Sequence, residues 1–177
     1  LDTIPHDTPY LAAPAEHAAK WRERLRGCEG LRVGLAWSGS RTLRNDANRS
    51  IALARLAPLA APGRMLVSVQ KDIREPDRAI MAQLGIVSFE AELGDFRDTA
   101  GLIDALDVVV SVDTAAAHLA GAMGKATWVL LPFSPDWRWL LGRDDSPWYP
   151  TARLFRQPAR GDWETPLNAL DEALRKL

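Results

Sequence analysis

Residues 108–118 read Val-Val-Val-Ser-Val-Asp-Thr-Ala-Ala-Ala-His, and this stretch decides the fold class. Its first five residues are apolar or small, which predicts a strand buried on both faces of a sheet. Asp113 follows directly and is expected to cap a helix that runs through His118 to Met123 and ends at Gly124. A buried strand that passes directly into a helix is the repeating unit of parallel α/β sheets.

The same alternation of strand and helix extends in both directions from this stretch. Further apolar strands are predicted at residues 31–37, 65–69, 86–89, 127–131 and 152–156. Helices are expected at residues 15–27, 53–60, 75–84, 99–106 and 163–177, with Asp98 as the N-cap of the fourth. The sequence therefore predicts an α/β fold, a doubly wound Rossmann-like parallel sheet of about six strands.

Length and composition predict one globular domain. The chain has 177 residues, 47% of them hydrophobic and 25% charged, and about 150 residues is a common domain size. Residues 1–14 carry three prolines and no clear periodicity, so they are interpreted as a linker or strap from an upstream domain. Residues 15–177 are assigned to the domain itself, and the missing initiator Met suggests a piece of a longer protein.

The charge balance and the lack of targeting signals limit which partners and which location are expected for the protein. With 22 Lys and Arg against 23 Asp and Glu, the net charge is −1, so bulk attraction to nucleic acid or anionic lipid is not expected. No apolar run approaches the roughly 18 residues of a membrane span, and the N-terminus is not a signal peptide. Cys28 is the only cysteine and cannot form an internal disulfide, so a cytoplasmic location is expected.

The strongest candidate site follows the strand at residues 108–112. In doubly wound sheets, ligands bind beyond the carboxyl ends of the strands. The unpaired N–H groups at the start of the next helix favour an anion, and the small side chains after Thr114 let a phosphate approach the backbone. His118 lies about one and a half turns further and is placed to donate to the ligand. Alternatively, Asp113 and Thr114 only cap the helix and His118 packs internally.

Two further candidates also follow strands. The loop 38–50 offers the hydroxyls of Ser38 and Ser40, with arginines that include Arg49, which suits phosphate binding. The alternative is a solvated loop. Gln70 and Lys71 follow the strand at 65–69, where they either contact a nucleotide or belong to a simple turn.

Tryptophans gather late in the chain. The run from Pro132 to Trp139 is rigid and aromatic and follows a predicted strand. It either forms a stacking wall for a base or sugar or, as we favour, packs internally or against a partner.

Several other chemistries find no support in the sequence. No G-x-G-x-x-G follows the first strand, and the Gly124-Lys125 pair lacks both the spacing and the strand-to-helix context of a P-loop. The three histidines and Cys28 have no metal-ligand spacing, so neither a metal nor another cofactor is expected.

The residues as a set resemble a known family. Val33–Trp37 with its polar loop, Asn48–Ile51, Leu66–Lys71 and the run from Ser111 to Lys125 are similar to the carboxyl-terminal half of heptosyltransferase-like enzymes, glycosyltransferase family 9 of the GT-B architecture. The runs 132–139 and 146–149 resemble most closely the version found behind tetratricopeptide repeats in bacterial proteins. The resemblance spans about residues 31 to 165.

This resemblance implies a nucleotide-sugar donor site in a cleft between two domains. Asp113, Thr114, Ala115, Ala116 and His118 match the family's donor-binding turn, and Ser38, Ser40 and Arg49 match its first-strand loop. With the candidates above, the predicted donor-binding residues are Ser38, Ser40, Arg49, Gln70, Lys71, Asp113, Thr114, Ala115, Ala116 and His118. Two of them depart from the family pattern, because Arg49 stands where Lys is usual and Ala115 where Gly is usual.

The implied chemistry is sugar transfer from a nucleoside-diphosphate sugar. Backbone N–H groups and cations stabilise the departing diphosphate without a metal. The family's acceptor half, with its general base, is absent from these 177 residues, so the catalytic residues are unknown and this piece is expected to bind donor without turnover. Two alternatives remain: a non-catalytic interaction module with a Trp-rich docking surface at 128–148, and a relative of nucleotide-sugar epimerases.

Overall fold

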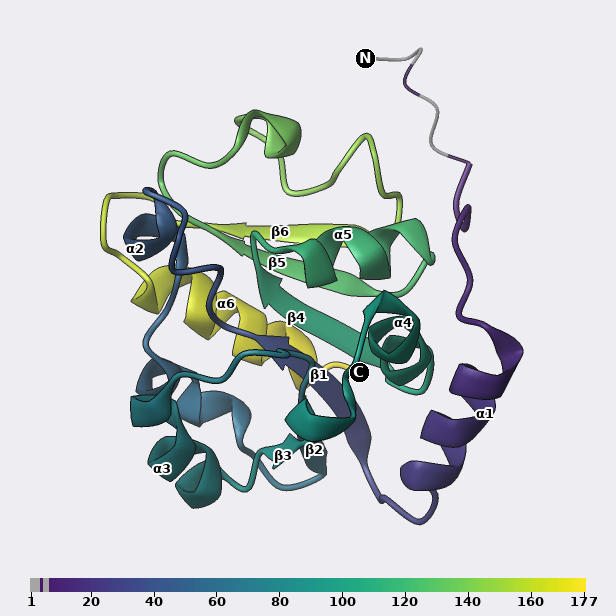
Figure 1. The fold of residues 1–177 in the computed structure, drawn as a ribbon. Helices are drawn as coiled ribbons and strands as arrows, with labels where there is room; N and C mark the ends of the chain where they lie inside the picture. Colours follow the sequence, from purple (N-terminus) through teal and green to yellow (C-terminus); the bar gives the residue numbers. More distant parts are fainter. Residues whose placement is uncertain (1–3, 5–6) are drawn as a thin grey trace.

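The computed structural model describes residue 4 and residues 7–177 of the chain. In chain order, its elements are α1 (Ala15–Arg24), β1 (Leu31–Ala36), α2 (Asp46–Arg49), the 3-10 helix η1 (Leu53–Leu59), β2 (Arg64–Ser68), α3 (Glu75–Leu84), β3 (Val87–Ser88), the 3-10 turn η2 (Glu90–Glu92), α4 (Phe96–Asp104), β4 (Val108–Val112), α5 (Ala115–Ala122), β5 (Thr127–Leu131), the 3-10 turn η3 (Trp137–Trp139), β6 (Ala152–Arg156) and α6 (Glu164–Leu174) (Figure 1).

The six strands form one parallel sheet in the order β3-β2-β1-β4-β5-β6. The predicted doubly wound, Rossmann-like sheet is thus confirmed. From β1 the chain builds outward to β3 and then returns to place β4 on the other side of β1, with Leu35 opposite Val110. The strand order therefore reverses between β1 and β4, and ligands of such sheets bind at this point.

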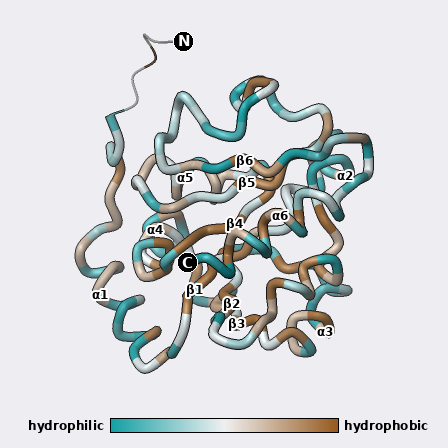
Figure 2. The backbone as a smooth tube through the Cα atoms, turned by 180° about the vertical axis from the view of Figure 1, so that it is seen from behind, coloured by the Kyte–Doolittle hydropathy of each residue, from teal (hydrophilic) through white to brown (hydrophobic). Residues whose placement is uncertain are grey.

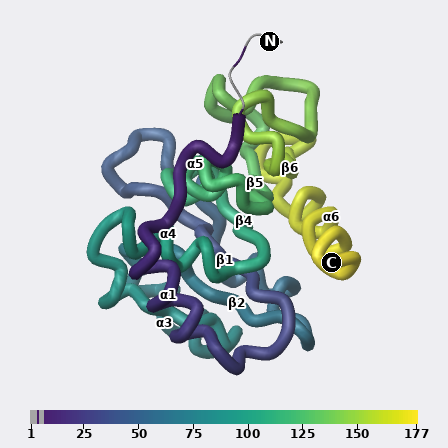
Figure 3. The backbone as a smooth tube through the Cα atoms, turned by 90° about the vertical axis from the view of Figure 1, so that its right-hand side faces the viewer, coloured from purple at the N-terminus to yellow at the C-terminus, as the bar shows by residue number. Residues whose placement is uncertain are grey.

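Helices cover both faces of the sheet. On one face, η1, α3 and α6 pack on Val33 and Leu35 of β1 and Val110 of β4. On the other face, α1, α4 and α5 pack on Val67 of β2 and Val109 of β4. All five residues of β4 are buried, and Figure 2 shows it as hydrophobic along most of its length. Figure 3 shows α4 and α5 on one side of the strands and α6 on the other.

Two local predictions differ from the structure. The N-cap of α4 is Asp95, whose side chain accepts from Arg97 N, so the prediction of Asp98 as the cap is wrong. Asp98 lies one turn in and instead accepts from Gly94 N at 3.0 Å. Asp95 thus caps the helix, and Asp98 in its first turn binds the backbone just before the cap. A search for one capping residue does not distinguish these two roles. The polar loop after β1 also contains a short helix, α2, that the sequence did not predict.

The segment before α1 lies along the end of α5. The N–H groups of Tyr10 and Leu11 both donate to Ala122 O, at 3.0 and 3.2 Å. The predicted strap covers residues 1–14, of which residues 1–3 and 5–6 lie outside the described residues. Its assignment as a link to an upstream domain stays a prediction.

Candidate functional site

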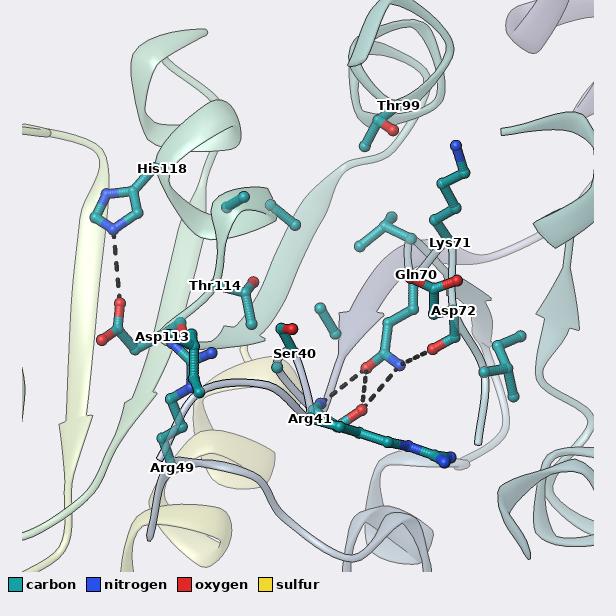
Figure 4. A pocket seen from close by; sticks show the side chains of 18 of the residues that line it. Ser40, Arg41, Arg49, Gln70, Lys71, Asp72, Thr99, Asp113, Thr114 and His118 are labelled. Atoms are coloured by element: carbon teal, nitrogen blue, oxygen red, sulfur yellow. Dashed lines mark hydrogen bonds and ion pairs between the residues drawn. The ribbon is translucent and has the colours of Figure 1, made fainter. Parts of the chain in front are cut away.

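A cleft of about 970 Å³ opens at the carboxyl ends of β1, β2 and β4. It lies where the strand order reverses, which is the position expected for a ligand in this fold. Figure 4 shows its labelled side chains coming from two sides, with His118, Asp113 and Thr114 on one side and Gln70 and Lys71 on the other. All ten predicted site residues line this single cleft: Ser38, Ser40, Arg49, Gln70, Lys71, Asp113, Thr114, Ala115, Ala116 and His118.

The start of α5 forms one wall of the cleft. β4 ends at Val112 and α5 begins at Ala115, so only two residues separate them. The first N–H groups of a helix have no intrahelical acceptor, and here they belong to Ala115 and Ala116, two residues with small methyl side chains that line the cleft. This wall is therefore suited to an anionic group.

Asp113 does not cap α5, contrary to the sequence-based expectation. The N-cap residue is Thr114, whose side chain makes no capping hydrogen bond and whose hydroxyl lies 2.8 Å from that of Ser111. The Asp113 carboxylate turns instead toward His118, with Oδ1 3.5 Å from Nε2, as the dashed line in Figure 4 shows. Asp113 is thus free of a structural capping role and belongs to the cleft.

His118 connects Asp113 to a tyrosine far along the chain. Its Nδ1 lies 3.0 Å from the hydroxyl of Tyr149, and its ring stacks on the fully buried Trp139, with centroids 5.1 Å apart. Sequence reasoning did not assign Tyr149 to the site, because 31 residues separate it from His118. The run 132–139 divides into two roles, since Trp139 packs inside while Trp137 is 64% exposed.

Asp113 and Tyr149 lie on either side of His118, and their surroundings set the protonation state of each. Burial alone would raise the pKa of Asp113, but the hydrogen bond and charge of His118, with Arg49 nearby, lower it overall. Burial raises the pKa of Tyr149 to about 12, and Tyr10 adds to the effect. At neutral pH the carboxylate is therefore ionised and the phenol keeps its proton.

Ser38 and Gln70, which follow β1 and β2, are joined by hydrogen bonds. Gln70 Oε1 accepts from the backbone N–H of Trp37 at 2.6 Å and of Ser38 at 2.8 Å. Its amide nitrogen donates to the Ser38 hydroxyl at 3.1 Å. Both residues are buried, so the Gln70 side chain fixes the base of the cleft.

Arg49 ties the loop after β1 to the start of α5. Its Nη1 donates to the backbone oxygen of Asp113 at 2.9 Å, and its Nε lies 3.4 Å from Asp46 Oδ1. The buried Asp46 also pairs with Arg74. The guanidinium of Arg49 runs so close beneath Gly39 that any Cβ there would overlap it. Arg49 is thus a cleft residue whose Nε and Nη1 are already engaged within the chain.

The remaining cations of the cleft differ in how they are held. Lys71 Nζ donates to Gly94 O at 2.5 Å, and Arg138 pairs with Asp136. Arg41 is exposed and lines the cleft, and within the described part of the chain it makes no hydrogen bond or ion pair. Beside it, the hydroxyls of Ser40 and Thr42 lie 2.8 Å apart. Sequence reasoning named Arg49 as the cation of this loop and did not single out Arg41.

The described residues contain neither a metal-binding cluster nor a membrane-spanning helix. Among residue 4 and residues 7–177, no group of three or more His, Cys, Asp or Glu side chains is placed to hold a metal ion. Over the same residues, no helix is long and apolar enough to cross a membrane.

Comparisons with curated proteins and with solved structures both give matches that cover most of the chain. The chain is 29% identical to Protein FlbA of Caulobacter vibrioides over 181 residues, which is 98% of this chain and 30% of that protein. Its fold matches the structure of E. coli ADP-heptose lps heptosyltransferase II with a TM-score of 0.58 and 16% identity, over 94% of this chain and 53% of that one. No protein-family profile matches the chain.

These comparisons establish a shared fold. The chain spans under a third of the relative and about half of the heptosyltransferase. Its Rossmann-like sheet therefore shares its fold with about half of that heptosyltransferase structure.

Proposed function

We propose that this chain is the donor-binding domain of a GT-B glycosyltransferase of the heptosyltransferase-like family, and that it binds a nucleoside-diphosphate sugar. The observation that carries the proposal is the single cleft at the strand-order reversal, which gathers all ten predicted residues. The fold likeness to a heptosyltransferase supports it. The family's tetratricopeptide-repeat context, an upstream domain and a cytoplasmic location belong to the same proposal.

The geometry suggests how the cleft receives a diphosphate. Ala115 and Ala116, whose N–H groups begin α5 at its positive end, line the cleft. Arg41, on the loop after β1, adds an unpaired positive charge. As a glycosyl bond breaks, negative charge grows on the departing diphosphate, and donors already fixed in place stabilise it. On this proposal Asp113, which is ionised, accepts hydrogen bonds from sugar hydroxyls and does not contact phosphate.

Catalysis is expected to need more chain than these 177 residues. The resemblance places the acceptor site and the general base in the other half of the GT-B pair, and this chain matches about half of the heptosyltransferase. We therefore expect donor binding without transfer to an acceptor.

The test is the thermal stability of the chain against ADP, UDP, GDP and their sugar conjugates. A ligand at 100 times its dissociation constant stabilises by roughly 2.7 kcal/mol, or about 5–11 °C for a domain of this size. A shift from one diphosphate series would support the proposal and identify the base. No shift, together with no NMR perturbation by any ligand of the panel, would contradict it.

A matched pair of alanine variants locates the site. Ala115 and Ala169 are both exposed helical alanines, but only Ala115 lines the cleft. Ala115→Leu should abolish the ligand-induced shift, because the larger side chain covers the first N–H groups of α5. Ala169→Leu on α6 should leave the shift unchanged. If the two variants showed the same ligand-induced shift, the ligand would not bind at the start of α5.

A second candidate function rests on exposed aromatic and apolar side chains beyond β5. Phe133, Trp137 and Leu141 are 50%, 64% and 76% exposed, and the Trp137 ring meets Trp148 edge to face at 6.2 Å. Such a surface is typical of protein contacts. If the chain is an interaction module, Trp137→Ser should abolish self-association or partner binding, and no nucleotide should shift the melting temperature.

A further inference from the structure

Tyr149 lies against α5 in a space that a glycine provides. A Cβ on Gly121 would stand 2.5 Å from Cγ of Tyr149, so a larger residue there would push the ring away. Gly121 comes three residues after His118, which places the two on the same side of the helix. Tyr149 itself is 9% exposed. The surface of α5 thus has room at Gly121 for the Tyr149 ring, next to the His118 imidazole.

Both nitrogens of the His118 ring face groups of this chain. Nδ1 lies 3.0 Å from the Tyr149 hydroxyl, and Nε2 lies 3.5 Å from Asp113 Oδ1. Trp139 stacks on the ring with an interplanar angle of 18°, which fixes the plane in which the nitrogens point. The ring is therefore held in orientation by three side chains.

The chemistry of the two partners selects one tautomer. An ionised carboxylate only accepts hydrogen bonds, so the nitrogen that faces Asp113 must carry the proton. Nδ1 is then unprotonated and accepts from the Tyr149 hydroxyl. The opposite tautomer would set a lone pair of Nε2 against the Asp113 carboxylate, which is repulsive. The geometry therefore defines one direction of donation, from the Tyr149 hydroxyl to Nδ1 of His118, with the Nε2–H of the same ring pointing toward the Asp113 carboxylate.

We propose that Tyr149 is a positioning residue, which donates to Nδ1 of His118 and so holds the ring with its Nε2–H toward Asp113, keeping the Asp113 carboxylate oriented in the cleft. The inference rests on the proposed function for what the carboxylate contacts, namely a hydroxyl of the donor. In this arrangement the imidazole supports Asp113 and does not itself donate to the ligand.

The direct test is the protonation pattern of the His118 ring in the ligand-free chain. Two-bond ¹H–¹⁵N spectra distinguish the tautomers, and His118→Gln assigns the signal among the chain's three histidines. At pH 8.5, where an ordinary imidazole is neutral, the wild-type ring should carry its proton on Nε2. Tyr149→Phe keeps the aromatic ring but removes the donor to Nδ1. Asp113 still holds the proton on Nε2, so the ¹⁵N resonance of Nδ1 should move toward that of an imidazole nitrogen with a free lone pair. A proton on Nδ1 in the wild type, or an unchanged Nδ1 resonance in Tyr149→Phe, would overturn the proposal.

The chain's other tyrosine supplies the control. Tyr10 approaches the Tyr149 hydroxyl but is 57% exposed, and Tyr10→Phe should leave the His118 pattern as in the wild type. A change equal to that of Tyr149→Phe would assign the effect to the pair of phenols and contradict a specific role of Tyr149.

Ligand affinity measures how the loss of the Tyr149 hydroxyl affects binding in the cleft. With the diphosphate that stabilises the wild type best, or its sugar conjugate, Tyr149→Phe should weaken binding about fivefold, the worth of one hydrogen bond. In an Asp113→Asn background it should add no further loss, because the carboxylate it orients is gone. Independent, additive losses would contradict the positioning role. If no nucleotide binds even to the wild type, the proposed function fails while the tautomer result still decides the role of Tyr149.

Discussion

Among the described residues, the Arg41 side chain makes neither a hydrogen bond nor an ion pair in the cleft. Arg49, named from the sequence, is by contrast engaged with Asp46 and the Asp113 backbone. We therefore expect Arg41→Ala to weaken nucleoside-diphosphate binding about fivefold, or about 1 kcal/mol, as is usual for an exposed ion pair. The loss should shrink as salt is raised, because exposed charges are screened. Calorimetric titration at two ionic strengths measures both effects.

Arg44 is the matched control for this prediction. It is exposed on the same loop and does not line the cleft. Arg44→Ala should therefore change affinity by less than twofold, an effect within the range of ordinary surface substitutions. A comparable loss in both variants would mean that the loop acts only through its overall charge.

Sequence reasoning located the residues of the cleft better than their contacts. Asp113 and His118 were found because they directly follow a buried strand, a position that the α/β fold turns into a ligand edge. Their partner Tyr149 was missed because no spacing rule links residues on different elements. Gln70 was found for its position, but its hydrogen bonds to the Trp37 and Ser38 backbone require the register of β1 against β2.

At the scale of elements, the strands were the most predictable part. β4, β5 and β6 have the bounds that the sequence predicted. For β4 and β5 the reason is that a fully buried parallel strand needs a largely apolar run. The loop between β1 and η1 was the least predictable. Its helix α2 has only four residues, too few for a periodic pattern, and it is held by the contacts of Asp46 with Ser50 and Arg74.

The loop between β5 and β6 depends on one arginine. Arg156 Nε donates to Arg143 O at 2.6 Å and Nη1 to Leu140 O at 3.0 Å, and Nη2 bonds Trp139 O. Lys cannot span three carbonyls in this way. Arg156→Lys should destabilise the chain by about 2 kcal/mol, or about 4–8 °C. Amides of residues 132–151 should also exchange faster with deuterium.

Arg153 on the same strand is the control for this element. Its exposed guanidinium lies over the Phe155 ring at 4.9 Å and makes no hydrogen bond to the loop among the described residues. Arg153→Lys should change stability by less than about 0.5 kcal/mol. Equal losses in the two variants would show that the loop does not depend on Arg156.

At the scale of the whole molecule, a buried ion pair joins the closing helix to the first half of the sheet. Arg64 at the start of β2 and Asp171 on α6 have side chains only 5% and 9% exposed, and Nη1 lies 2.6 Å from Oδ1. Asp171→Asn should cost about 3 kcal/mol, or about 6–12 °C, because it leaves the buried guanidinium without its counter-charge. Thermal melts of wild type and variant at pH 7 measure this.

The same pair predicts how stability depends on pH. Burial alone would raise the pKa of Asp171, but Arg64 and Arg175 lower it below its usual value. A group with a lowered folded-state pKa stabilises the protein above its unfolded pKa, near 4, and loses that contribution as pH falls through the folded value. The gap in melting temperature between wild type and Asp171→Asn should therefore be widest at neutral pH and close in acid.

Glu172 stands next to Asp171 and provides the control. It pairs with Lys176, and both side chains are about 70% exposed, so Glu172→Gln should cost less than about 0.5 kcal/mol. If this variant lost as much stability as Asp171→Asn, the link between α6 and β2 would not explain the effect.

The contacts of Arg49 and Gln70 have a consequence for the thermodynamics of binding. They bridge the segments after β1, β2 and β4 through contacts within the chain itself, so much of the conformational entropy of these segments is already lost when the protein folds. A ligand that enters a preorganised cleft has little further ordering to impose. Its association should therefore be fast and largely free of a slow rearrangement, except for the short loop tip that carries Arg41.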